Sequence, residues 1–143
     1  MLIIIPARGG SKTIRRKNLQ PVAGKPLFLH VAATCRQAFP DARIIVSTDD
    51  PEIESVALIH GYLIHHRSGY TSSDEATVDD VVFEVVATQP DDDTVLMVQP
   101  TVPQITVKQL QDLAIEFEQS GDEAWAVGSE HRHITWTLSL IHI

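Results

Sequence analysis

The sequence predicts an α/β protein in which a mainly parallel β-sheet is covered by helices on both faces. Short, continuous apolar runs of β character alternate with longer segments in which apolar residues recur at three- and four-residue spacing. Continuous apolar runs are typical of strands buried on both faces, and intervening helices supply the crossovers that parallel pairing needs. The 143 residues, 43% of them hydrophobic, are enough for one such domain.

The predicted elements follow one another along the chain in this alternation. Five apolar runs predict strands over Leu2–Ile5, Arg43–Ser47, Tyr62–His65, Thr94–Val98 and Ala124–Val127. Four segments with helical spacing predict helices over Pro26–Phe39, Pro51–His60, Asp74–Thr88 and Thr106–Gln119. The second helix has the clearest start, because Asp50 can cap it and Pro51 suits its first turn.

The ends of the predicted strands indicate where a ligand binds. In an open parallel sheet, ligands lie beyond the carboxyl ends of the strands. Segments 7–12, 48–50 and 99–101, together with Arg67, follow such ends. We therefore expect a Rossmann-like sandwich in which these four segments converge on one crevice.

The loop after the first predicted strand is the most informative part of the chain. Gly9 and Gly10 let the backbone pass close to a ligand, and successive N–H groups with Arg8 and Lys12 can meet a negative charge. A simple turn followed by a solvated basic face is the alternative. Because cations recur inside the turn itself, we favour a cradle for nucleotide phosphates.

The distribution of charge supports a polyanionic ligand. The first acidic residue is Asp41, and seven cations precede it: Arg8, Lys12, Arg15, Arg16, Lys17, Lys25 and Arg36. The rest of the chain holds all 19 Asp and Glu, so the formal net charge is −8 although the amino end is basic. We expect no nucleic-acid binding, since the basic run lacks interleaved aromatic residues and the overall charge opposes it.

Several other classes of function are disfavoured by the sequence. It contains neither Gly-x-Gly-x-x-Gly nor a Walker loop, which argues against hydride transfer and ATP hydrolysis. The single cysteine, Cys35, lies among small apolar residues and is expected in the core. The histidines do not complete a metal-ligand set. No apolar run approaches the roughly 20 residues of a membrane span, so we expect a cytoplasmic protein without membrane contact.

Five ordered blocks of sequence resemble the acylneuraminate cytidylyltransferases, the CMP-N-acetylneuraminic acid synthetase family. The blocks are the loop Ile4–Lys12 with Arg16–Leu19, then Ala23–Leu27, Val46–Asp50, Ser73–Thr77 and Gln99–Pro103. The resemblance implies a Rossmann-like nucleotidyltransferase. In its reaction the anomeric hydroxyl of a nine-carbon sugar acid attacks the α-phosphate of CTP, and pyrophosphate leaves as the CMP-sugar forms.

The resemblance also implies roles for individual residues. Catalysis is assigned to cations that handle the triphosphate, namely Arg8, Lys12 and Lys17. Binding of nucleotide or sugar is assigned to Ala7, Gly9, Gly10, Ser11, Asn18, Arg67, Asp74, Thr77 and Gln99. For Asp74 a helix cap is favoured over a ligand contact, and for Asp49 and Asp50 both a metal ligand and a cap stay open.

Family members are longer, and the resemblance places their Mg²⁺ ligands, much of the sugar pocket and the contacts of a homodimer in the carboxyl-terminal portion. We therefore expect residues 1–137 to form an incomplete, inactive or weakly active cytidylyltransferase domain. Residues Leu138–Ile143 match one reading frame of a transposon-end sequencing adapter and are expected to be an artefact. Synthetases for pseudaminic or legionaminic acid, and a non-catalytic nucleotide-binding module, are the alternative functions.

Two blocks depart from the family pattern. The loop has Thr13 and Arg15 where the family commonly has Gly and Pro, which alters its freedom and predicts a changed affinity for nucleotide. The last block has Val102 and Gln104 where the family has Ser and Leu, and Ile105 where it has Arg. Cytidylyltransferases for octulosonic acids usually carry a different block at Gln99-Pro100-Thr101, which argues against that substrate.

Overall fold

The computed structural model describes residues 1–11, 13–89, 94–120, 124–130 and 133–142. One sheet contains six strands: β1 (Leu2–Pro6), β4 (Arg43–Thr48), β5 (Leu63–His66), β6 (Thr94–Val98), β7 (Ala124–Glu130) and β8 (His133–His142). The α-helices are α1 (Leu27–Ala38), α2 (Pro51–Ile59), α3 (Val78–Val86) and α4 (Val107–Ser120). A short helix η1 (Lys17–Leu19) and the pair β2 (Pro21–Val22) and β3 (Lys25–Pro26) follow the first loop.

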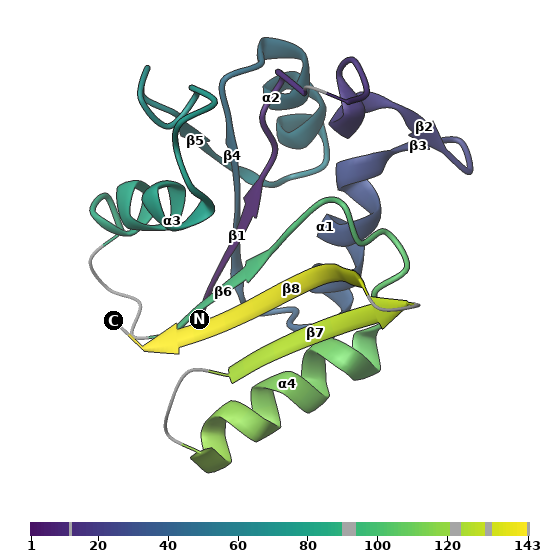
Figure 1. Ribbon diagram of the computed structural model, residues 1–143, viewed down its shortest axis with the longest axis vertical. Helices are drawn as coiled ribbons and strands as arrows, with labels where there is room; N and C mark the ends of the chain where they lie inside the picture. Colours follow the sequence, from purple (N-terminus) through teal and green to yellow (C-terminus); the bar gives the residue numbers. More distant parts are fainter. Residues whose placement is uncertain (12, 90–93, 121–123, 131–132, 143) are drawn as a thin grey trace.

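The sheet has the order β5-β4-β1-β6-β8-β7. Strands β5, β4, β1 and β6 pair in parallel, whereas β8 is antiparallel to both β6 and β7. The chain therefore runs outward from β1 on one side and resumes on the other side with β6, as seen in Figure 1. This reversal of strand order creates the switch point at which open α/β sheets bind ligands. The predicted mainly parallel sheet is confirmed.

Strand β8 was not among the predicted strands. Residues 138–142 of β8 pair with residues 94–98 of β6. Ile134, Trp136, Leu138 and Leu140 alternate with polar or small residues, which is the period-two signal of a strand.

None of the helices in the described part of the chain has the length and apolar character needed to cross a lipid bilayer.

Strand β1 is buried on both faces, as the continuous apolar run predicts. Ile3 and Ile5 pack into one core with residues of α1, α2 and α4. Leu2 and Ile4 pack into a second core with residues of α3. Cys35 is fully buried in the first core, and this burial raises the pKa of its thiol to about 12. The sheet is therefore the middle layer of a three-layer sandwich.

The amino ends of the helices agree with the sequence in one case and differ in another. Asp50 caps α2 by accepting hydrogen bonds from the N–H groups of Glu52 and Ile53, as predicted. Helix α3 begins at Val78 rather than Asp74, and its cap is Thr77. Thr77 and Asp80 form a reciprocal capping box, so the preference for Asp74 as the cap was wrong. Residues 74–77 form a loop that precedes the helix.

Candidate functional site

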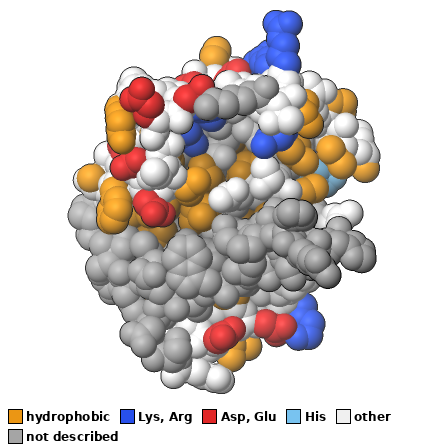
Figure 2. Space-filling view, in the orientation of Figure 1, with side chains coloured by type: hydrophobic (Ala, Val, Ile, Leu, Met, Phe, Trp, Pro, Cys, Tyr) orange, Lys and Arg blue, Asp and Glu red, His pale blue; other side chains and the backbone are white. Residues whose placement is uncertain are grey.

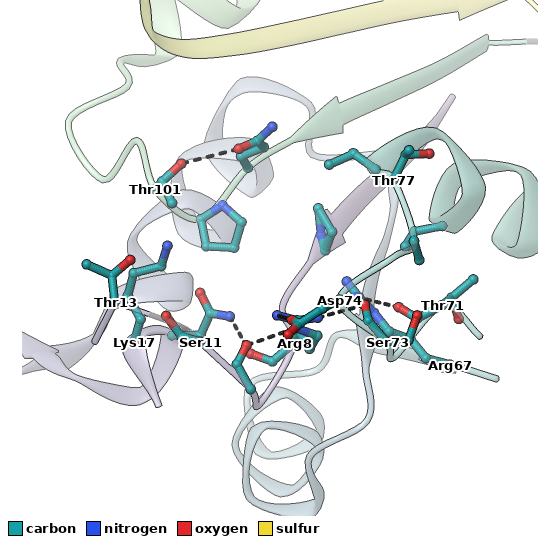
Figure 3. A pocket seen from close by; sticks show the side chains of 18 residues that line it. Arg8, Ser11, Thr13, Lys17, Arg67, Thr71, Ser73, Asp74, Thr77 and Thr101 are labelled. Atoms are coloured by element: carbon teal, nitrogen blue, oxygen red, sulfur yellow. Dashed lines mark hydrogen bonds and ion pairs between the residues drawn. The ribbon is translucent and has the colours of Figure 1, made fainter. Parts of the chain in front are cut away.

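A cavity of about 370 Å³ lies at the carboxyl edge of the parallel strands. Its wall comes from segments far apart in the sequence: Pro6, Arg8, Gly10, Ser11, Thr13, Lys17, Asn18, Arg67, Thr71, Ser73, Asp74, Ala76, Thr77, Val78, Val81, Gln99, Pro100 and Thr101. Figure 3 shows the first loop on one side of this cavity and the segment after β5 on the other, with Arg8 and Asp74 between them. The segment after β6, with Thr101, closes a third side.

The cavity brings together most of the predicted site residues. Those that line it are Arg8, Gly10, Ser11, Lys17, Asn18, Arg67, Asp74, Thr77 and Gln99. Ala7 and Gly9 do not line it, and Lys12 lies outside the described residues. In the space-filling view, basic side chains lie among apolar and acidic ones in the upper half of the molecule (Figure 2). The wall thus combines loop backbone, hydroxyl groups and cations.

Ala7 and Gly9 support the loop rather than the cavity. Ala7 is fully buried, and its N–H donates to the carbonyl of Ser47 at 2.8 Å. The N–H of Gly9 donates to Oδ1 of Asp49, also at 2.8 Å. A Cβ at position 9 would lie 2.6 Å from Oδ2 of Asp50, so glycine is required there for close packing. The loop therefore lies directly against the junction of β4 and α2.

This junction was expected to line the crevice, but it lies behind the loop. Of segment 48–50, no residue is part of the described cavity wall. Asp50 instead accepts two hydrogen bonds from Arg16 at 2.8 Å each, while capping α2. Burial, the largest single influence, raises the pKa of Asp50, but the bonds from Arg16 and from the N–H groups of Glu52 and Ile53 together lower it. Asp49 and Asp50 thus hold the loop in place.

Arg8 is held by four acceptors on two segments, one of which is the carbonyl of Ser72 at 3.4 Å from Nη1. Its Nε donates to the carbonyl of Gly10 at 2.9 Å, and Nη1 donates to the carbonyl of Ser73 at 2.7 Å. Nη2 donates to Oδ1 of Asp74 at 2.6 Å. Two of the amino-terminal cations, Arg8 and Arg16, therefore have carboxylate partners from later in the chain. The interpretation that these cations need an external anion was too simple for those two residues.

Arg8 and Asp74 also lie between two hollows. A second cavity, of about 420 Å³, shares Arg8, Gly10, Ser11 and Asp74 with the first and adds Ser72. Asn18 also fixes this loop, because its buried side-chain amide donates a hydrogen bond to the carbonyl of Arg8 at 2.8 Å. Arg8, Gly10 and Ser11 of the loop therefore line both cavities.

Arg67 differs from Arg8 and Arg16. Its Nε donates to the carbonyl and to the hydroxyl oxygen of Ser47, both at 3.2 Å, and Nη1 donates to the carbonyl of Thr71 at 3.1 Å. No carboxylate of the described residues lies within ion-pair distance of it. Burial lowers the pKa of Arg67, with a smaller opposing influence from Asp49. A half-buried cation without an acidic partner on a cavity wall is suited to an anionic ligand.

Three polar residues on the wall were not predicted, namely Thr71, Ser73 and Thr13. Thr71 is buried, and its hydroxyl donates to Glu84 of α3, which also accepts the N–H of Ser68 at 3.0 Å. The run of hydroxyl residues over 71–73, immediately before a predicted helix, was the signal available in the sequence. These contacts tie the segment after β5 to α3.

The described residues do not suit a magnesium ion held by protein groups alone. No group of three or more His, Cys, Asp or Glu side chains within them could hold a metal ion. Asp74 is the one carboxylate among the described residues of the main cavity, and it is already bonded to Arg8. Mg²⁺ takes one or two carboxylates plus phosphate oxygens, so further donors are required.

The fold and the site define a class: an α/β protein with a glycine-containing, cation-bearing loop at the switch point of its sheet, without the loops typical of dehydrogenases or ATPases. The sequence pattern of the cytidylyltransferases matches residues 2–134. The chain therefore belongs to the cytidylyltransferase family, which is a class of nucleotidyltransferases.

Three relatives show the range within this family. The chain is 37% identical over 108 residues to the CMP-N,N'-diacetyllegionaminic acid synthase of Legionella pneumophila, covering 72% of the chain and 47% of that protein. It is 37% identical over 100 residues to N-acylneuraminate cytidylyltransferase B of Danio rerio, covering 70% of the chain and 23% of that protein. It is 36% identical over 114 residues to 3-deoxy-manno-octulosonate cytidylyltransferase 2 of Burkholderia ambifaria, covering 78% of the chain and 41% of that protein.

A solved structure supports the fold independently. The structure of CMP:2-keto-3-deoxy-manno-octonic acid synthetase complexed with CTP superposes with a TM-score of 0.74 at 21% identity, covering 99% of this chain and 70% of that one. The predicted Rossmann-like nucleotidyltransferase fold is thereby confirmed. The chain spans less than half the length of each of the three relatives.

Proposed function

We propose that the cavity binds CTP and that the complete protein transfers CMP from CTP to a nine-carbon, acylneuraminate-type sugar acid. The observation that carries this proposal is the joining of the Gly10-Ser11 backbone, Lys17 and Arg67 on one cavity wall. Its volume of about 370 Å³ falls in the range of small-molecule sites. Membership of the cytidylyltransferase family supports CTP as the nucleotide.

The proposed reaction is a displacement at phosphorus. The anomeric hydroxyl oxygen of the sugar acid forms a bond to the α-phosphorus, the bond from that phosphorus to the bridging oxygen breaks, and pyrophosphate leaves with the electron pair. The hydroxyl proton passes to solvent. Negative charge grows on the phosphoryl oxygens and on the leaving group, so preorganised cations lower the barrier.

Each wall residue has a role in this scheme that follows from its position. Lys17 and Arg67 supply positive charge from opposite sides of the cavity, as Figure 3 shows. Ser11 and the loop backbone around Gly10 supply hydrogen-bond donors for phosphate oxygens. Arg8 contributes mainly by holding the loop to Ser73 and Asp74. Lys12 is assigned to the triphosphate by the family resemblance alone.

The identity of the sugar acid is a finer proposal than the nucleotide. The relatives act on diacetyllegionaminic acid, N-acylneuraminate and 3-deoxy-manno-octulosonate by their names, at comparable identity. We favour a nine-carbon acid because Gln99, Pro100 and Thr101 line the cavity, and these form the block that resembles the acylneuraminate enzymes. Legionaminic and pseudaminic acids are the nearest alternatives.

Magnesium and a second subunit are also part of the proposal. Mg²⁺ would neutralise the triphosphate when it enters with CTP, and its protein ligands would come from a portion outside this chain. The same portion would supply homodimer contacts, and a CTP-dependent reaction is consistent with a cytoplasmic location. A non-catalytic nucleotide-binding module is the alternative for the chain itself, since it spans 47% of the legionaminic acid synthase.

The first experiment is calorimetric titration of CTP with Mg²⁺ into the 143-residue protein, with ATP and GTP as controls. Selective binding of CTP, weakened in Lys17→Ala, supports the proposed site. Equal affinity for all three nucleotides, or for wild type and Lys17→Ala, contradicts it. Pyrophosphate release with neuraminic, legionaminic, pseudaminic and octulosonic acids then tests catalysis, and binding of CTP without release identifies a binding module. A circular-dichroism melt confirms that each sample is folded.

A further inference from the structure

A pair of polar side chains on neighbouring strands lies next to Arg67. Ser47 in β4 and His65 in β5 are register partners in parallel strands, so their side chains lie on the same side of the sheet. Ser47 Oγ and His65 Nδ1 are 3.1 Å apart. The same hydroxyl oxygen accepts a hydrogen bond from Arg67 Nε at 3.2 Å. The three residues form a continuous chain from β5 to the cavity wall.

The donor and acceptor properties of these groups favour one direction for the hydrogen bonds. A guanidinium has donors only, so the Ser47 hydroxyl oxygen accepts from Arg67. Ser47 is fully buried, and within the described residues its own proton has one available acceptor, Nδ1 of His65. This buried proton is satisfied when His65 is neutral, with its own proton on Nε2. A protonated His65 would direct a second donor at the same hydroxyl oxygen.

Ser47 holds Arg67 with its main chain as well. Its carbonyl accepts from Arg67 Nε at 3.2 Å and from the N–H of Ala7 at 2.8 Å. Nη1 of Arg67 is bonded to the carbonyl of Thr71, which leaves Nη2 as the part of the guanidinium without a described partner. The orientation of Arg67 is therefore set by neutral groups rather than by a carboxylate. Its positive charge stays available on the cavity wall.

We propose that Ser47 and His65 are positioning residues, which orient Arg67 toward an oxyanion of the bound substrate. This inference rests on the proposed function. The oxyanion belongs to the triphosphate of CTP or to the carboxylate of the sugar acid, because a guanidinium recognises both groups by the same planar donors. Glu84 from α3 and Arg67 and His66 from the β5 segment are the charged or titratable groups whose charges act on His65.

The experiment measures CTP binding by calorimetry from pH 5.5 to 8 for wild type, Ser47→Ala, His65→Gln and Arg67→Ala. His66→Gln is the matched control, because His66 is the next residue of the same strand with an exposed side chain and points to the opposite face. Comparing each variant with wild type at the same pH cancels the titration of CTP itself.

Loss of one hydrogen bond to Arg67 predicts about three- to tenfold weaker binding in Ser47→Ala at pH 7.5. Wild type should lose affinity relative to His65→Gln only as the pH falls through the pKa of His65, which burial holds below the ordinary value for histidine. Identical affinities of wild type, Ser47→Ala and His65→Gln at every pH, with binding lost in Arg67→Ala, overturn the positioning roles. If Arg67→Ala also binds normally, the proposed site has failed instead. Titration of the sugar acid alone distinguishes a carboxylate from a phosphate partner.

A second measurement needs no ligand and no altered side chain. Nitrogen NMR of the histidine rings in the wild-type protein should show His65 as the Nε2–H tautomer at neutral pH. The Nδ1–H tautomer overturns the proposal whether or not CTP binds. This result also decides the case in which Ser47→Ala does not fold.

Discussion

The guanidinium of Arg16 contacts both carboxylate oxygens of Asp50, each at 2.8 Å, across 34 positions of sequence. Arg16 has a left-handed backbone conformation, with φ of 52°, and immediately precedes Lys17 and Asn18. Because Asp50 also caps α2, one carboxylate joins the first loop to the amino end of a helix. The position of Lys17 on the cavity wall therefore depends on a residue that does not line the cavity.

Replacing Asp50 tests this double role. Asp50→Ala removes both the cap and the partner of Arg16, and loss of the cap alone predicts about 1 kcal/mol of lost stability. Asp50→Ser keeps a capping oxygen and removes the charge, so it should be less destabilising but should weaken CTP binding as much as Asp50→Ala. Urea denaturation and calorimetry measure the two effects. If Asp50→Ser binds CTP like wild type, Arg16 does not need this partner to place Lys17.

The two glycines of the loop should respond differently to substitution. In Gly9→Ala the new Cβ would lie 2.6 Å from Oδ2 and 2.7 Å from Cβ of Asp50, so the loop must move away from α2. Such overpacking predicts a loss of about 1–3 kcal/mol in the free energy of unfolding. In Gly10→Ala the nearest atom would be Nε of Arg8 at 3.6 Å, an ordinary contact, and stability should change by less than about 0.5 kcal/mol. Chemical denaturation of both variants measures the difference. Equal losses would show that the Asp50 contact does not restrict position 9.

The elements of the fold were largely predictable, because each depends on local patterns. The apolar run Leu2–Ile5 predicts a strand that is buried on both faces, and the pair Asp50-Pro51 predicts the start of a helix. The start of α3 was misjudged, since Ser, Asp and Thr all occur between 73 and 77 and any of them can cap a helix. Thr77 and Asp80 have the three-residue spacing of a capping box, which identifies the correct choice.

The sequence indicated many of the residues that line the cavity, but not which cations are paired with carboxylates of the same chain. Arg8, Lys17 and Arg67, which the sequence assigns to the site, all line the cavity, and their roles in binding and catalysis stay predictions. The partner of Arg8 is Asp74, 66 positions later, and no local pattern relates the two. Whether a cation is neutralised within the protein depends on which loops the sheet brings together. For this reason the sequence could not distinguish the paired Arg8 from the unpaired Arg67.

The capping box of α3 gives a prediction about Thr77, which also lines the cavity. Thr77→Ala removes the hydroxyl that accepts the Asp80 N–H and should cost about 1 kcal/mol of stability. Thr77→Ser keeps a capping hydroxyl and should be within a few tenths of a kcal/mol of wild type. Thermal and urea denaturation compare the two. A Thr77→Ser variant that loses as much stability as Thr77→Ala would show that packing of the methyl group, rather than the cap, is responsible.

The stability of the protein should depend on pH through His65. Burial lowers the pKa of His65, and Arg67 and His66 add to this, while Glu84 opposes it. A histidine whose pKa is lower in the folded state binds fewer protons there than in the unfolded chain, so stability rises with pH across the interval between the two pKa values. This contribution of His65 to the free energy of unfolding is complete above about pH 6.5 and is lost as the pH falls through the folded-state pKa.

The same experiment can separate His65 from the acidic groups. The pKa values of Asp50 and Glu84 are also lowered, but their effect begins only below the ordinary pKa values of 3.8 and 4.5. As the pH falls from 7.5 to 5, urea denaturation should therefore show a decline in the wild-type free energy of unfolding. This decline should be smaller in His65→Gln and largely retained in His66→Gln, because His66 is the smallest of the influences on the pKa of His65. Parallel curves for wild type and His65→Gln would mean that His65 is protonated as easily in the folded protein as in the unfolded chain. Its hydrogen bond to Ser47 would then have to be made by the Nδ1–H group.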